Sequence, residues 1–164
     1  MRAFLNRVTF GKLAFALLSI TLALTSYAGS KTDYLEDALI GHLFRGTPYT
    51  APTILYVGLM TTACSDAASG TEVSGGSYVR VGVANNSAQW NATSGGNGTT
   101  ANTNPITFAT PSADWGQVSH FGIWDASTAG NQLICNALTT PKTINNGDPA
   151  PSFSANALTY QEDD

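Results

Sequence analysis

The chain has 164 residues, of which 43% are hydrophobic, so it is long enough to form one domain with a buried core. Only 11% of the residues are charged, against roughly 25% in average soluble domains, while Gly, Ser, Thr and Asn are abundant. After residue 28, four basic side chains stand against eleven acidic ones, a net charge of −7. Because nucleic-acid binding needs clustered Lys and Arg to displace counterions from phosphates, this balance excludes DNA and RNA as partners.

Residues 1–28 have the pattern of a secretory signal. They combine a basic start, an apolar run over residues 13–24 and small residues before a cleavage point after Ala28. The apolar run is too short to span a bilayer comfortably, so membrane contact is expected only through an uncleaved leader. A further alternative is that translation starts downstream and the leader is not made. The mature protein is predicted to be a single domain over residues 29–164.

One short helix is predicted directly after the leader. Ser30 can cap it, Asp33 lies in its first turn, and Gly46 with Pro48 ends it. Its apolar stripe is expected to pack against a sheet, with a partner-binding helix as the alternative. His42 lies beside this stripe and is expected to be a histidine at the edge of the core, not a metal ligand. The apolar residues at helical spacing are Tyr34, Leu35, Ala38, Leu39 and Leu43.

Strands are predicted for the rest of the chain. Residues 53–60 are almost continuously apolar, which indicates a strand covered on both faces. Six or so strands separated by turn residues predict an all-β fold, an antiparallel β-sandwich of jelly-roll-like type that carries the single N-terminal helix. The predicted strands cover residues 53–60, 78–83, 106–108, 120–124, 132–138 and 152–160.

Two strands show a clear alternation. Residues 78–83 are expected to present one buried face and one face that carries Arg80. In residues 120–124, Phe121 and Ile123 are expected to face away from Gly122 and Trp124.

Residues 84–104 form a polar segment that is predicted to be an exposed loop or a poorly ordered hairpin. Trp90 is its only large apolar side chain and is expected either to fold back over the domain or to contact a partner. Asn91 and Asn97 are the other candidate contact residues. Deletion of residues 86–103 is expected to leave the fold intact.

Cys64 and Cys135 stand 71 positions apart, without a C-x-x-C motif or a Cys/His cluster. No zinc or redox site is therefore predicted. A disulfide between them and two separate buried thiols remain equal alternatives, because export is not established.

No catalytic motif is found in the sequence. The glycine-rich segment 70–76 contains no phosphate-binding Lys followed by Ser or Thr, and a G-x-S-x-G elbow does not occur. His120, Asp125 and Asp114 could form a triad with one of many serines, but serines this common make such a match worthless. We predict that the protein is not an enzyme and holds no metal or cofactor.

Six short segments occur in order along the chain: residues 34–36 (YLE), 50–59 (TAPTILYVGL), 70–76 (GTEVSGG), 113–116 (ADWG), 120–123 (HFGI) and 137–140 (ALTT). This ordered set resembles a family of small tailed-phage virion proteins, labelled tail fibre or decoration proteins. The resemblance covers about residues 31–160 and implies a non-enzymatic virion component with a compact β-sandwich, present in several copies on a tail or capsid. The chain has no fibrous repeat or heptads, so a decoration or tail-surface role is expected.

The resemblance implies location in the virion and, as partners, other virion proteins, further copies of the chain and a host-surface receptor. The alternative is a secreted adhesin-like or filament-forming module, released by cleavage after Ala28, which would bind through the Asn/Thr-rich loop and the tryptophans or join copies through strand edges. A hydrolase is the third hypothesis and would need a pocket that groups His120 with a carboxylate and a hydroxyl.

Overall fold

The computed structural model describes residues 31–93, 96 and 98–162. The predicted leader, residues 1–28, and Asn97 lie outside these residues. Within the described part of the chain, no helix has the length and apolar character needed to cross a membrane. The elements are α1 (Asp33–Arg45), β1 (Ile54–Met60), β2 (Val81–Ala84), β3 (Thr100–Ala101), β4 (Ile106–Thr107), β5 (Gly116–Trp124), β6 (Gln132–Ile144), β7 (Ser152–Phe153) and β8 (Thr159–Tyr160).

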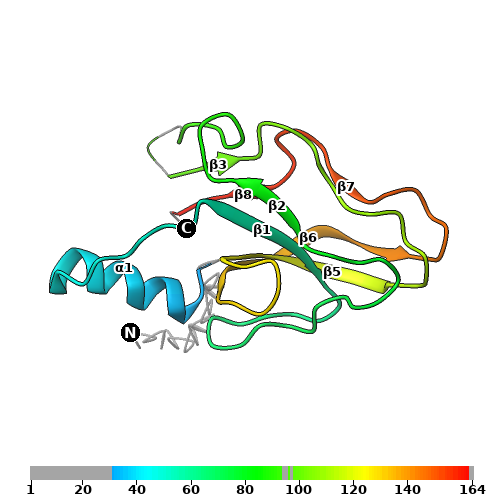
Figure 1. The fold of residues 1–164 in the computed structure, drawn as a ribbon, viewed down its shortest axis with the longest axis horizontal. Helices are drawn as coiled ribbons and strands as arrows, with labels where there is room; N and C mark the ends of the chain where they lie inside the picture. Colours follow the sequence, from blue (N-terminus) through cyan, green and yellow to red (C-terminus); the bar gives the residue numbers. More distant parts are fainter. Residues whose placement is uncertain (1–30, 94–95, 97, 163–164) are drawn as a thin grey trace, which may run out of the picture.

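The main sheet has four antiparallel strands in the order β2-β1-β5-β6 (Figure 1). Two short antiparallel ladders, β4 with β7 and β3 with β8, complete the strand pairing. The buried core includes residues of β1 and β5 together with Ile106 of β4 and Leu158, which directly precedes β8. The all-β, sandwich-like fold with a single short helix is therefore confirmed, whereas the prediction of one domain over residues 29–164 stays a prediction.

The two faces of the main sheet are set by the alternation in β1 and β5. Val57 pairs with Ile123 and Leu59 with Phe121, and all four side chains lie in the core. The intervening residues point to the opposite face, as expected for a strand period of two. The alternation predicted for residues 120–124 is confirmed.

The alternation predicted for residues 78–83 is wrong in its first half, because the strand starts only at Val81. Val79 is 63% exposed, while Tyr78 packs against the core beside Trp115. The cause is the preceding turn, where Gly76 and Ser77 both have positive φ angles and redirect the chain. The strand therefore begins three positions later than the sequence suggests, at Val81 and not at Tyr78.

The segments 132–138 and 152–160 also differ from the prediction. β6 continues to Ile144 through Pro141, which an edge strand tolerates because its outer N–H groups need no partner. The predicted last strand is two short strands, β7 and β8, separated by a turn in which Asn156 has a positive φ of 64°.

Candidate functional site

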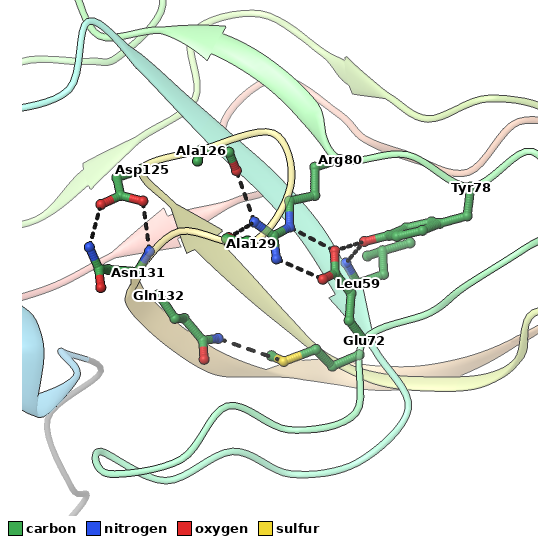
Figure 2. Close-up of polar contacts among 10 residues, drawn as sticks. Leu59, Glu72, Tyr78, Arg80, Asp125, Ala126, Ala129, Asn131 and Gln132 are labelled. Atoms are coloured by element: carbon green, nitrogen blue, oxygen red, sulfur yellow. Dashed lines mark hydrogen bonds and ion pairs between the residues drawn. The ribbon is translucent and has the colours of Figure 1, made fainter.

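A partly buried ion pair lies beside Gly58, on the face of the main sheet opposite the core. Arg80 donates through Nε and Nη2 to the two carboxylate oxygens of Glu72, with 2.8 Å for each bond (Figure 2). Its Nη1 donates to the carbonyl oxygens of Ala126 and Ala129, again at 2.8 Å. The Arg80 side chain is only 8% exposed, and four of its five N–H donors are used. This charge is compensated inside the protein and is not presented to a partner.

The Arg80 guanidinium also lies over the ring of Trp124, 4.0 Å from its centroid. The ring fits against the sheet because Gly58 and Gly122 have no side chains. A Cβ at Gly58 would lie 2.7 Å from the Trp124 ring, and one at Gly122 would lie 2.6 Å from it. The absence of side chains at Gly58 and Gly122 therefore allows the Trp124 ring to pack between the sheet and Arg80.

Tyr78 closes the network on its other side. Its hydroxyl accepts a bond from the Leu59 N–H at 2.8 Å and donates to Glu72 at 2.9 Å (Figure 2). Burial, aided by the nearby Glu72 carboxylate, raises the pKa of the Tyr78 hydroxyl above its ordinary value. The group stays protonated and acts as a fixed donor.

Two segments that carry the family resemblance meet beside this network. The indole Nε1 of Trp115 donates to the Gly76 carbonyl at 2.9 Å, and a Cβ on Gly76 would lie 2.9 Å from the same nitrogen. The segments GTEVSGG and ADWG therefore hold each other in place. In this structure the contacts between these two segments stabilise the fold.

The residues of the imagined triad are not brought together. His120 Nδ1 lies 2.8 Å from the hydroxyl of the neighbouring Ser119. Asp125 accepts two bonds from Asn131, and Asp114 accepts one from a backbone N–H in the turn after β6. Both carboxylates are thus engaged in turns. Among the described residues, no group of three or more His, Cys, Asp or Glu side chains could hold a metal ion.

The end of the polar segment 84–104 is an internal part of the fold. Asn102 is completely buried, and its Nδ2 donates to the carbonyls of Asn104 and Ser154 at 2.8 Å each. Its Oδ1 accepts a bond from the N–H of Leu158 at 2.8 Å. The segment predicted to be an exposed loop is therefore exposed only in part. The Asn102 side chain takes the place of backbone hydrogen-bond partners for three backbone groups.

Two of the three candidate contact residues of this segment, Trp90 and Asn91, contact other parts of the protein. Trp90 is half-buried against the core, and its Nε1 has no hydrogen-bond partner among the described residues. Asn91 is exposed, but its side chain bonds to Asn156 at 2.6 Å and to Thr103 at 3.0 Å. Asn97 lies outside the described residues. A contact role for Trp90, Asn91 and Asn97 stays a prediction.

Cys64 and Cys135 are bonded as a disulfide in the structure, with 6.4 Å between their Cα atoms. The bond ties the segment after β1 to β6. Thr32, which precedes α1, donates its N–H to Leu133 of β6, and the N–H of Asp33 donates to the Asp66 carbonyl. The base of α1 is therefore held by the two segments that the disulfide joins.

A groove of about 460 Å³ lies between β6 and the β7–β8 segment. Its volume is in the range of small-molecule sites. Its floor is apolar, with Phe121 and Phe153, and the charged side chain among its lining residues is Lys142. Such a groove can hold an apolar group but offers no pair of groups for acid–base chemistry.

Helix α1 differs from the Arg80 network because it exposes large apolar side chains to solvent. No residue of this helix, Asp33–Arg45, is buried, and in Figure 1 it extends away from the strands. Ile40, Leu43 and Phe44 are 53%, 71% and 77% exposed. At spacings of three and four they form one continuous apolar surface, which we call the α1 patch.

The sequence interpretation missed two members of the α1 patch. The predicted stripe contained Leu39 and Leu43 but not Ile40 or Phe44. The sequence contains a signal for these exposed residues. Apolar residues occupy most of the circumference of the second half of the helix, and one sheet-facing stripe cannot contain them all.

A family model described as podophage GP4 fiber I protein gp80 matches residues 30–161. The chain belongs to this family. The resemblance to tailed-phage virion proteins is therefore confirmed, and the chain is a member of a fibre family of virion structural proteins. No curated protein matches it.

Proposed function

We propose that the chain is a non-enzymatic, fibre-associated subunit at the tail or capsid surface of a phage-like particle, and that it acts through repeated protein–protein contacts. The family match supports location in a phage-like particle. The exposed α1 patch is the observation that supports contacts with other proteins. Other virion proteins are then its partners.

The distribution of polar and apolar groups favours this role over catalysis. Arg80, Glu72 and Tyr78 are held by one another, so they are fixed in place and not free to react. The α1 patch, in contrast, keeps three large apolar side chains in water. Since each Å² of apolar surface removed from water contributes about 25 cal/mol, covering the patch with another protein is favourable.

The secreted adhesin-like or filament-forming module remains the alternative function, because the leader has the pattern of an export signal. The edge of the main sheet formed by β6 is a poor joint for such a filament. The outer edge strand β6 carries Pro141, Lys142 and a register shift against β5 between Val118 and His120, all of which oppose edge pairing.

Mass spectrometry of density-purified particles from the source culture tests the proposed function. We expect abundant peptides of this chain in the particle fraction at a fixed ratio to the other virion proteins. If the chain is missing from particles and is found in the periplasm or medium with a new N-terminus at Gly29, the proposal is wrong and the secreted module is favoured.

A further inference from the structure

The side of α1 that carries the α1 patch also carries three exposed acidic residues, which we call the acidic border. The acids come first along this side, and from the first acid to the last apolar residue it is about 17 Å long at 1.5 Å per residue. The less exposed residues Leu35, Ala38 and Leu39 lie on the opposite side of the helix. The acidic border and the α1 patch fall within about 120° of the helix circumference and are made up of Asp33, Glu36, Asp37, Ile40, Leu43 and Phe44.

The charges of the acidic border are not compensated within the described part of the chain. None of its three carboxylates takes part in either of the ion pairs found there. The basic residues of the helix, His42 and Arg45, lie in its last turn and on its other side. This side of α1 therefore presents only negative charge beside its apolar surface.

The stability of the helix explains only part of this arrangement. Asp33 and Glu36 lie in the first turn, where the helix dipole favours acidic side chains. Asp37 lies beyond that turn and four residues after Asp33, and like charges at this spacing destabilise a helix. The position of Asp37 is therefore unfavourable for the free helix and becomes favourable when a cation is placed beside it.

We propose that this side of α1 docks on a different virion protein, on a surface where Lys or Arg residues lie next to an apolar hollow. The inference rests on the proposed function, because it names the chemistry of the partner at the same surface. The basic groups face the acidic border, which sets the register of the contact and speeds association. The hollow receives the α1 patch and removes its apolar area from water.

Two other occupants fit the charges less well. A second copy of the chain offers few cations, because only four basic residues follow residue 28 and two of them, Lys31 and Arg80, are already held in ion pairs. An anionic membrane surface attracts helices with Lys and Arg beside the apolar side, and α1 has acids there. The charge pattern therefore favours a basic protein surface.

Retention of the chain in density-purified particles tests the inference through charge reversal. For Asp37→Lys, the ratio of this chain to the other virion proteins, measured by quantitative mass spectrometry, should fall about tenfold or more, because a favourable contact becomes repulsive. Asp37→Asn, which only removes the charge, should have a smaller effect. Val79→Lys places the same side chain at another exposed position and is the matched control, which should be retained like the unaltered chain.

Thermal unfolding of the isolated variants distinguishes a contact role for Asp37 from a structural one. Asp37→Lys replaces a like-charge pair with Asp33 by an opposite-charge pair at spacing four, so the melting temperature should stay the same or rise slightly. Lower retention together with an unchanged melt supports the inference. If the melting temperature and the retention fall together, Asp37 stabilises the fold and the inference is overturned.

Carbodiimide coupling of the unaltered particles identifies the partner, since the reagent joins carboxylates to lysine amines that are in contact. We expect peptides that contain residues 33–37 to be joined to lysines of another virion protein. The inference is overturned if they are joined mainly to lysines of this chain, or if Asp37→Lys is retained like Val79→Lys. It is also overturned if the chain floats with vesicles of phosphatidylcholine and phosphatidylglycerol and Leu43→Ser abolishes this, because α1 then binds lipid.

These outcomes separate the inference from the proposed function. If the unaltered chain and Asp37→Lys are equally abundant in particles, the chain remains a virion subunit and only the basic partner surface is wrong. If the unaltered chain is missing from particles, the proposed function itself is wrong.

Discussion

The Arg80 network and the α1 patch differ in which side chains they expose to water. Around Arg80, charged groups are withdrawn from water and each is given a partner within the chain. On α1, large apolar side chains are left in water without a partner among the described residues. The difference separates what holds the fold together from what is available for contact, and stability measurements should distinguish the two regions clearly.

The largest effect is expected for Arg80→Ala. It leaves the Glu72 carboxylate partly buried without its cation and uncaps two turn carbonyls, so the free energy of unfolding should fall by about 3–5 kcal/mol. Urea denaturation measures the loss. Leu43→Ser on the α1 patch is the matched comparison and should change stability by no more than about 0.5 kcal/mol. Equal losses in the two variants would contradict the division into scaffold and contact regions.

Removal of the disulfide by Cys64→Ser with Cys135→Ser should cost up to about 4 kcal/mol, because the closed loop spans 71 residues. Since the joined segments hold the base of α1, hydrogen exchange in the first turn of the helix should also accelerate. The control is intact mass measured with and without reductant. Two free thiols in the protein isolated under oxidising conditions would show that the bond does not form.

Asn102→Ala should lower the free energy of unfolding by about 2–3 kcal/mol, since it leaves the Leu158 N–H and two carbonyls without their partner. The exposed Asn91→Ala is the control in the same segment and should cost less than about 1 kcal/mol. For the same reason, deletion of residues 86–103, which the sequence alone suggests would leave the fold intact, should instead abolish the cooperative melt. A deletion variant that melts like the parent would show that Asn102 is dispensable.

The smallest effect concerns pH. Because the pKa of Tyr78 is raised in the folded state, its contribution is fully present below the unfolded value of about 10 and is lost as the pH rises above it. Chemical denaturation at a series of alkaline pH values should show this decline, and Tyr78→Phe should flatten it. An unchanged slope in the variant would mean that other groups cause the decline.

Local patterns in the sequence predicted those parts of the fold in which neighbours along the chain decide the structure. The alternation of β5 and the end of α1 at Gly46, which adopts the left-handed conformation, are of this kind. β6 was predicted too short because Pro141 is a turn signal, and only its place at the sheet edge shows why the strand continues.

The site residues were harder to predict because their partners come from distant segments. Arg80 and Glu72 are separated by a turn whose positive φ angles bring the side chains together, and Trp124 joins them from β5. Asn102 looks like any other asparagine in a polar run, although two of its three side-chain hydrogen bonds join residues more than fifty positions later. The sequence of residues 84–104 alone contains no pattern that indicates such contacts.

Photo-crosslinking in assembled particles tests most directly whether α1 is the contact surface. A photo-reactive amino acid is placed at position 43 in one variant and at position 79 in another, since Leu43 and Val79 are 71% and 63% exposed. We expect crosslinks to another virion protein from position 43 and little product from position 79. Equal yields from the two positions, or none from position 43, would contradict the account.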